Sequence, residues 1–214
     1  MLLVLIAGYV DAFGLIQLQT FVSFMSGNTT TSGMLVGAGS FAAAVPALVA
    51  VAFFVCGVLC GSLVGVAAPE NAQRICFALV SGFIVAYIVF ARNWPLGGLP
   101  GIAMLSIAMG MLNTTVSRIG FEPVNIGYVS GTLSRMADHL ARAIARQPLP
   151  DAQTPADSHE RRAVTLAGVW LAFLGGAIGS GAATLRFGVD ALVLPLAVLL
   201  LFSVQEGRQP APPR

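Results

Sequence analysis

The residues MLLVLIAGYVDAFGLIQLQTF (1–21) form an apolar run with a single carboxylate, Asp11, at its centre. About 20 apolar residues are enough for a helix to cross the roughly 30 Å hydrocarbon core of a bilayer. A carboxylate at that depth costs at least about 2.5–3.5 kcal/mol on insertion scales, so an intramembrane acid is by default a functional-site hypothesis. The run has no basic segment at its start, which argues against a secretory signal.

The whole chain has the composition of a membrane protein. Its 214 residues are 57% hydrophobic and 9% charged, whereas a soluble domain has about 25% charged residues. Backbone groups inside lipid must be satisfied within the protein, so each long apolar run is expected to be a helix. The predicted fold class is all-α and polytopic, with six transmembrane helices at about 2–21, 42–67, 75–91, 97–117, 163–185 and 187–204.

The arginines predict the orientation of the chain in the membrane. The sequence has 11 basic residues, and all of them are Arg. With six spans, Arg92 and Arg186 fall on one side, and the other nine fall on the side that holds both termini. Cytoplasmic segments of membrane proteins carry the excess of Arg and Lys. Both termini are therefore predicted to be cytoplasmic.

Three short patterns recur in the same order in the two halves of the chain. Gly8-Tyr-Val-Asp11 corresponds to Gly110-Met-Leu-Asn113, Phe24-Met-Ser-Gly27 to Tyr128-Val-Ser-Gly131, and Gly57–Ser62 to Gly175–Ser180. This predicts two three-helix repeats, 1–94 and 95–205, followed by a disordered tail, 206–214. Each repeat has an odd number of spans, so the second copy is inverted. Inverted repeats are common in secondary transporters, whose sites lie near the midplane between the repeats.

Asp11 and Asn113 occupy equivalent places in the first helix of each repeat, and they are expected to meet at the repeat interface. A buried carboxylate that faces an amide can be hydrogen-bonded without a second charge. Two roles are open for the pair. Either the pair binds a proton or a solute, or it has only the structural role of holding two helices together.

A polar segment follows the first helix of each repeat. In residues 23–33, Ser26 or Asn28 is predicted to cap a short helix that runs to about Leu35. Free N–H groups at such a helix start suit an anion or a polar solute; the alternative is an external loop with an ordinary cap. The predicted substrate- or ion-binding residues are Asp11, Gln17, Ser26, Gly27, Asn28, Thr29, Asn113, Ser130, Gly131 and Thr132.

The second polar segment continues as an amphipathic helix at about 133–146, with Arg135, Arg142 and Arg146 on its polar face. A cationic amphipathic helix on the cytoplasmic side is predicted to lie against anionic lipid. His139 is on the same polar face and is expected to be solvated rather than to act as a ligand.

Residues 147–161 are predicted to form a short flexible linker. Thr154 is expected to cap the fifth helix, with Pro155 as its first helical residue.

Small residues mark two of the predicted helices. Gly57 and Gly61 in the second helix, and Gly175 and Gly179 in the fifth, have the four-residue spacing of close helix packing, either between the repeats or across a dimer. Cys56 and Cys60 are also four residues apart. They are interpreted as small packing residues rather than as ligands of a soft metal.

Four stretches together resemble the YoaK-like family of bacterial inner-membrane proteins: Gly8-Tyr-Val-Asp-Ala12, Phe24-Met-Ser-Gly-Asn-Thr29, Asn113 and Tyr128-Val-Ser-Gly-Thr132. The resemblance covers essentially the whole chain. Its most specific part is Gly-x-x-Asp-Ala followed by Ser/Thr-Gly-Asn at this separation. The resemblance implies a multi-span protein of the bacterial inner membrane. The family is regarded as a domain of unknown function, so no substrate or mechanism is implied.

The predicted function is a secondary transporter of a small polar solute, coupled to H⁺ through Asp11. The main alternative is a membrane scaffold or sensor that acts through residues 133–146. An enzyme is disfavoured, because both histidines lie in the cytoplasmic segment and neither HExxH nor Gly-x-Ser-x-Gly occurs. No cofactor, metal or nucleic acid is expected. The expected partners are the bilayer, anionic lipid at the cytoplasmic face, the solute, and a second copy of the chain.

Overall fold

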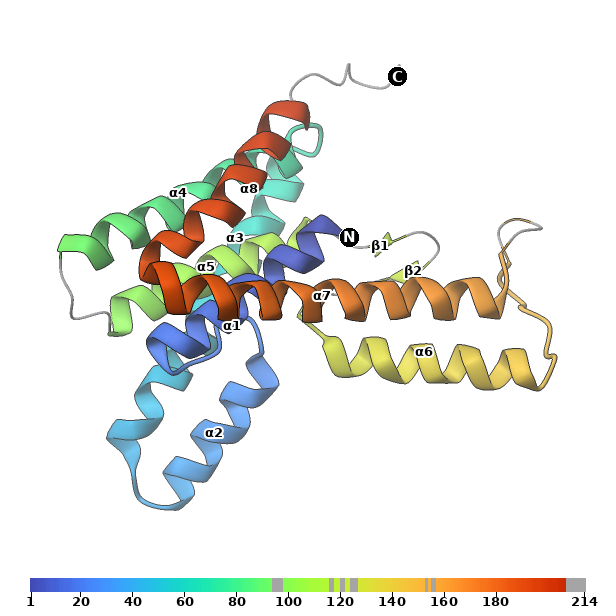
Figure 1. Ribbon diagram of the computed structural model, residues 1–214, viewed down its shortest axis with the longest axis horizontal. Helices are drawn as coiled ribbons and strands as arrows, with labels where there is room; N and C mark the ends of the chain where they lie inside the picture. Colours follow the sequence, from blue (N-terminus) through green and yellow to red (C-terminus); the bar gives the residue numbers. More distant parts are fainter. Residues whose placement is uncertain are drawn as a thin grey trace.

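The computed structural model describes residues 1–93, 98–115, 118–119, 122–123, 127–152, 154 and 157–206. In these ranges the chain is almost entirely helical, as predicted (Figure 1). A two-residue antiparallel pair, β1 (Arg118–Ile119) with β2 (Glu122–Pro123), is a small addition to the all-α prediction. The helices are α1 (Leu2–Leu18), α2 (Met25–Gly37), α3 (Phe41–Ala67), α4 (Ala72–Asn93), α5 (Leu99–Thr114), α6 (Val129–Ile144), α7 (His159–Phe187), the 3₁₀ turn η1 (Gly188–Leu192) and α8 (Val193–Glu206).

Three apolar stretches of the described chain are long enough to cross a membrane: Phe41–Ala67, Ala72–Asn93 and His159–Val204. The third has 46 residues and contains α7, η1 and α8, which folds back to lie beside α4 (Figure 1). α1 and α5 are apolar but shorter, with 17 and 16 residues, or roughly 25 Å of helix. Residues 207–214 of the predicted tail lie outside the described residues.

The central bundle is built by two helix pairs that pack along each other, α1 with α7 and α3 with α5. α4 lies against α5 on one side and α8 on the other. Aromatic side chains fill the centre, where the Phe13 and Tyr87 rings meet edge to face with centroids 5.8 Å apart. The Tyr9 hydroxyl donates to the Ala191 carbonyl at 2.9 Å, which ties α1 to the turn before α8.

Glycines allow the close approach in both helix pairs. A Cβ on Gly8 would overlap the Phe173 carbonyl of α7, and one on Gly110 would overlap the Phe54 carbonyl of α3. Gly57 meets α5 at Ile107 in the same way. Backbones this close leave no room for any side chain, so these positions require glycine.

Three of the four predicted packing glycines make contacts with a neighbouring helix, and the fourth does not. Gly57 and Gly61 do pack against α5, Gly61 beside Thr114, and Gly179 makes ordinary contact with the Tyr9 ring at 3.8 Å. Gly175 faces open space, however, and the close contact in α7 is made by Gly176 against Leu5. One residue is a rotation of about 100° around a helix, so the repeat alignment in this helix is shifted by one position.

Replacing Gly176 by alanine is expected to destabilise the protein by about 1–3 kcal/mol, because the new Cβ forces α1 and α7 apart. Gly175→Ala is the matched control: it adds the same atom to the neighbouring residue, where it meets nothing within 4 Å. Thermal unfolding in detergent measures both. Equal unfolding temperatures for the two variants would show that α1 and α7 are not in contact here.

Two helical hairpins leave the central bundle in different directions (Figure 1). One is α2 with the first half of α3, and the other is α6 with the first half of α7. The start of α7 differs from the prediction. The helix begins at His159, with Ser158 as its cap accepting from the Arg161 N–H at 3.3 Å, so Thr154 is not the cap. Pro155 lies outside the described residues.

Candidate functional site

Asp11 holds the break between α1 and α2. Its carboxylate is 4% exposed, and Oδ1 accepts from the N–H groups of Val22, Ser23 and Phe24 at 3.0, 2.7 and 3.3 Å. α1 continues for seven residues beyond Asp11 to Leu18, a rise of about 10 Å. The chain therefore turns back by about this distance before α2 begins, and the start of α2 lies level with the middle of α1.

The start of α2 is organised differently from the prediction. Neither Ser26 nor Asn28 caps the helix, because its cap residue is Phe24 and no cap side chain bonds to it. Asn28 is buried and donates its amide to the Phe21 carbonyl at 2.7 Å. The Phe24 ring lies against Gly27, where a Cβ would overlap it. The acceptor for the N–H groups before α2 thus comes from a different helix.

A second break with the same local form separates α5 from α6. α6 begins after Tyr128, whose ring lies against Gly131 as the Phe24 ring lies against Gly27. The Thr132 N–H and hydroxyl both donate to the Tyr128 carbonyl at 3.1 Å. The pattern Phe/Tyr-x-x-Gly, which recurs in the sequence, is therefore an aromatic residue that covers a glycine in the first turn of a helix.

The two breaks meet at one small cavity. Ser23, from the first break, and Gly127, from the second, line it together with Phe54, Met109, Leu112 and Asn113. The space is too narrow to admit a water molecule. The Asn113 carbonyl oxygen is buried there without a hydrogen-bond partner among the described residues. An unsatisfied buried acceptor of this kind favours a ligand or a conformational change that supplies a donor.

The predicted meeting of Asp11 and Asn113 is indirect. Ser23 lies between them. Its N–H donates a hydrogen bond to Asp11, and Ser23 lines the small cavity together with Asn113. The described part of the chain contains no hydrogen bond that joins the two side chains. Asp11 Oδ1 accepts hydrogen bonds from backbone N–H groups. The side-chain oxygen of Asn113, in contrast, has no donor among the described residues.

The other predicted site residues separate into two groups. Gly131 and Thr132 are buried at the start of α6, and Asn28 is buried in α2. The exposed ones do not line the cavity between the breaks; they are Gln17, Ser26, Thr29 and Ser130. The Thr29 hydroxyl donates to the Met25 carbonyl at 2.8 Å, which satisfies it within its own helix.

A larger cavity of about 370 Å³ lies between the end of α1, α2 and the start of α3. Its polar lining consists of amide and hydroxyl side chains, and none of the lining residues is charged. Asn28 connects it to the first break, because its amide holds the Phe21 carbonyl. The lining residues are Leu15, Leu18, Gln19, Thr20, Phe21, Asn28, Thr31, Leu35, Ala43, Pro46 and Ala47.

A buried cluster of charges holds α6 against α7, and the sequence did not predict it. The Glu122 side chain is 1% exposed, and Oε2 lies 2.7 Å from Arg135 Nη2. Its Oε1 lies 3.2 Å from His139 Nε2 and 3.3 Å from Arg162 Nη1. The two contacts with arginine are close ion pairs rather than well-aligned hydrogen bonds, and the contact with His139 is an ion pair only when that ring is protonated. His139 is 8% exposed, so the expectation that it is solvated was wrong.

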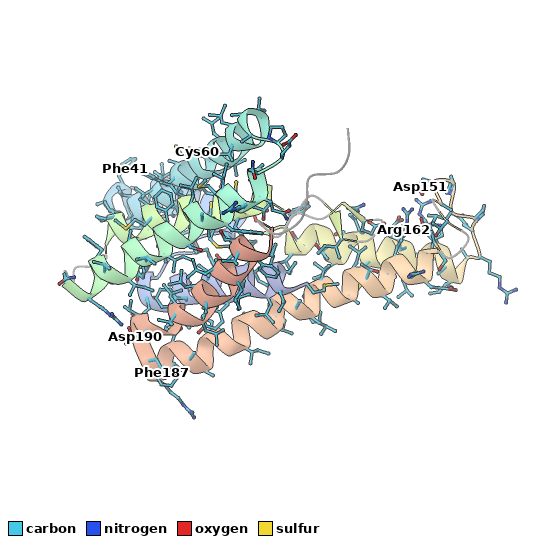
Figure 2. All side chains as sticks on the ribbon, turned by 90° about the horizontal axis from the view of Figure 1, so that it is seen from above. Phe41, Cys60, Asp151, Arg162, Phe187 and Asp190 are labelled. Atoms are coloured by element: carbon cyan, nitrogen blue, oxygen red, sulfur yellow. The ribbon has the colours of Figure 1, made fainter. Side chains whose placement is uncertain are left out.

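Arg162 is the centre of the same cluster. Its guanidinium donates to both oxygens of Asp157, at 2.9 and 2.8 Å, and to Asp151 Oδ2 at 2.9 Å. Figure 2 shows Arg162 and Asp151 together at the far end of the α6–α7 hairpin. The hydrogen bond from Arg162 lowers the pKa of Asp151, as a bonded cation does for a carboxylate.

The sequence contains one weak indication of this cluster. Arg135 and His139 are four residues apart, which places them on one helix face, but the same pattern is typical of a helix that lies against lipid and water. Their partner Glu122 comes from a segment outside the recurring patterns. Cys56 and Cys60, which are interpreted from the sequence as small packing residues, are exposed on α3.

Comparison with known proteins gives a family. Residues 1–205 match the model of a family described as "Protein of unknown function (DUF1275)". The chain belongs to this family. It is 30% identical over 139 residues to UPF0700 transmembrane protein RA0705 of Rhizobium meliloti (strain 1021), which covers 64% of this chain and 58% of that protein. It is 28% identical over 149 residues to UPF0700 transmembrane protein YoaK of Bacillus subtilis (strain 168), 65% of each chain.

The family match confirms the resemblance found in the sequence. The matched regions span about three fifths of the length of these relatives, at 58% and 65%, and no solved structure matches the chain. Both relatives are described as transmembrane proteins. Together with the three long apolar stretches, this makes the DUF1275 chain a membrane protein. The family description supplies no substrate, so the function is argued from the breaks and cavities.

Proposed function

We propose that the chain is a secondary transporter of a small, uncharged polar solute, which binds where the two helix breaks meet. The observation that carries the proposal is the cavity between Ser23, Asn113 and Gly127, to which both breaks contribute. Discontinuous helices that meet near the middle of the membrane are the usual construction of transporter sites. Irregular backbone at that depth occurs where it is buried in protein or lines a cavity.

The proposal includes two inverted repeats, in which α1 to α4 correspond to α5 to α8. Reciprocal packing supports this correspondence. Gly8 meets Phe173 while Gly110 meets Phe54, and Gly176 meets Leu5 while Gly57 meets Ile107. Each glycine lies three residues after the residue that meets its partner glycine, in both halves of the chain. In six spans, with both termini in the cytoplasm of a bacterial inner membrane, the two hairpins would extend toward opposite sides.

The chemistry of the lining favours an uncharged solute. Ser23 and Asn113 are neutral, and the 370 Å³ cavity beside the first break has no charged residue in its lining. The carboxylate of Asp11 already accepts hydrogen bonds from three N–H groups, and these bonds hold the first break in place. Since the cavity between the breaks admits no water, solute entry requires α2 or α6 to move relative to the bundle.

Two features of the proposal concern the surroundings of the transporter. α6 exposes Leu140 and Ile144, at 50% and 76%, and this apolar edge beside arginines fits the cytoplasmic lipid surface. A homodimer would add protein around a bundle of modest size.

The same exposed edge of α6 also supports the second candidate function, a scaffold or sensor that docks through α6. A catalytic role is not part of the proposal.

Replacing Asn113 by leucine is expected to reduce solute-dependent flux by about 10- to 100-fold, because a lost hydrogen bond in a buried site costs about 1–3 kcal/mol. The assay is flux into proteoliposomes for a panel of amides, polyols, nucleobases, amino acids and ions. Gln17→Leu is the control, because Gln17 is exposed in α1 and should leave flux unchanged.

Three outcomes separate the candidate functions. Flux of a neutral solute that is lost in Asn113→Leu and kept in Gln17→Leu supports the proposed site. Flux that depends on Gln17 and not on Asn113 would place the site elsewhere. Wild-type protein that is folded but moves no solute contradicts the transporter proposal. If binding to vesicles then depends on Leu140 and Ile144, the scaffold function is supported instead.

A further inference from the structure

The only two histidines of the chain are in direct contact. His139 of α6 and His159 of α7 are 8% and 6% exposed, and their Nδ1 atoms are 2.8 Å apart. The rings lie at 44° to each other with centroids 5.1 Å apart. Two like atoms at this distance form a hydrogen bond only if one carries a proton and the other presents a lone pair.

The neighbours of the pair assign its protons. His139 Nε2 lies 3.2 Å from Glu122 Oε1, and the carboxylate favours the tautomer with a proton on this nitrogen. Nδ1 of a neutral His139 is then the acceptor, and His159 Nδ1 is the donor. The remaining nitrogen, His159 Nε2, presents a lone pair. It is buried and has no hydrogen-bond partner among the described residues.

The geometry leaves room for one added proton. A proton on His159 Nε2 makes that ring an imidazolium, and its Nδ1 still donates to His139. A proton on His139 Nδ1 would instead place two N–H groups against each other and break the contact. The pair therefore accepts one proton without rearrangement, and a second one only if α6 and α7 separate.

A cavity lies beside His159, and the Nε2 atom itself is buried. The cavity has a volume of about 310 Å³ and lies between the end of α6 and the start of α7. His159 lines it together with polar and charged residues of both helices and of the linker. The other lining residues are Ala143, Arg146, Gln147, Leu149, Asp157, Ser158 and Glu160.

The charges around the pair come from every element packed against it. The groups are Glu122 on β2, Arg135, Asp138 and Arg142 on α6, Arg146 just after it, Asp151 and Asp157 in the linker, and Glu160, Arg161 and Arg162 on α7. Among the side chains that the structure describes, these are five carboxylates and five guanidinium groups, so their charges cancel. One proton on His159 then gives the cluster a net positive charge. Imidazole is the side chain that changes charge near neutral pH.

α6 connects this pair to the helix break. His139 lies 11 residues after Tyr128, the residue that begins α6 beside Gly127, or about 16 Å along the helix. Moving as a rigid unit, α6 would transmit a change in how His139 contacts α7 to Gly127, which lines the cavity between the breaks. The histidine pair and the proposed solute site therefore share one moving element.

We propose that His139 and His159 form the proton-binding site through which this membrane protein is coupled to H⁺, with His159 Nε2 as the atom that takes the proton. The coupling rests on the proposed transport function; the proton site itself does not. Asp11, which the sequence suggested for this role, holds the first break instead. Proton uptake at the pair changes the charge of the cluster that holds α6, and with it the free energy difference between closed and open forms of the site.

Nitrogen NMR of the full chain labelled with ¹⁵N-histidine tests the site directly, because only two imidazoles contribute signals. At high pH we expect one ring with its proton on Nε2 and the other with its proton on Nδ1. As the pH falls, the Nδ1-protonated ring should take up one proton first, before the other ring titrates. Two rings with the same tautomer that titrate together and independently would overturn the proposal.

Flux in proteoliposomes tests the coupling. Wild-type flux should change about tenfold with pH, and flux through His159→Asn should change by less than about twofold over the same pH range. Glu70→Gln is the control, because Glu70 is exposed between α3 and α4, far from this cluster in the chain, and should keep the wild-type pH profile. An unchanged pH profile in His159→Asn overturns the inference alone. No wild-type flux at any pH overturns the proposed function and the coupling with it.

Discussion

Asp11→Ala is expected to destabilise the folded protein by about 3–6 kcal/mol. The carboxylate accepts from the buried N–H groups of Val22 and Ser23 and from the partly buried N–H of Phe24, and each buried donor left without a partner costs about 1–3 kcal/mol. The loss should be local at first, because these bonds hold the turn before α2 against the middle of α1. Thermal unfolding in detergent measures the change in stability, and proteolysis near residues 19–24 measures the release of the turn.

Asp11→Asn separates the hydrogen bonds from the charge. The amide oxygen of asparagine still accepts from one or two of the N–H groups, so the loss should be about half that of Asp11→Ala. Asp190→Ala is the control for removing an acid, because Asp190 is 56% exposed in its pair with Arg92. Unfolding of Asp11→Ala at the wild-type temperature is the result that would show that the carboxylate does not hold the break.

The two asparagine variants also distinguish Asp11 from the histidine pair. If the coupling proton binds at His159, Asp11→Asn keeps the pH dependence of flux while its unfolding temperature falls. If Asp11 is the proton site, the pH dependence disappears in Asp11→Asn and persists in His159→Asn. The second pattern would restore the hypothesis drawn from the sequence, in which a lone intramembrane acid is the coupling residue.

The sequence predicted the helices because their signal is local. Apolar runs of helix length mark the apolar helices, and the polar segment after residue 22 marks the break before α2. The cap of α2 was not predictable in the same way. The donors are backbone N–H groups, which every residue except proline has, and their acceptor Asp11 is more than ten residues away in another helix. A cap from a distant side chain leaves no pattern in the capped segment.

The histidine pair was missed for a related reason. His139 and His159 are 20 residues apart, and only the packing of α6 on α7 brings them together. In the sequence, the polar face of α6 has the same composition whether it meets water, lipid headgroups or a buried ion cluster. The shift from Gly175 to Gly176 shows the same limit on a smaller scale. Two adjacent glycines both satisfy a small-residue pattern, and the tertiary contact alone decides which of them packs.

Arg162→Ala is expected to destabilise the α6–α7 hairpin by about 3–5 kcal/mol, because it removes a buried cation that pairs with two buried carboxylates, Glu122 and Asp157. The side chains of Glu122 and Asp157 are 1% and 0% exposed, and that of Arg162 is 7% exposed. Hydrogen exchange of α6 and thermal unfolding of the whole chain measure the effect. Arg162→Lys keeps the charge but loses the planar fork that holds both oxygens of Asp157, so its loss should be intermediate.

Arg92→Ala is the matched control for Arg162→Ala, because it also removes an arginine from an ion pair. The side chains of Arg92 and Asp190 are 58% and 56% exposed, and exposed pairs contribute about 0–1 kcal/mol. α6 should therefore exchange at its wild-type rate in Arg92→Ala and much faster in Arg162→Ala. If Arg162→Ala also leaves α6 protected, the ion cluster does not hold the hairpin. A proton on His159 would then have no effect on the position of α6, and the link from the histidine pair to the helix break would fail with it.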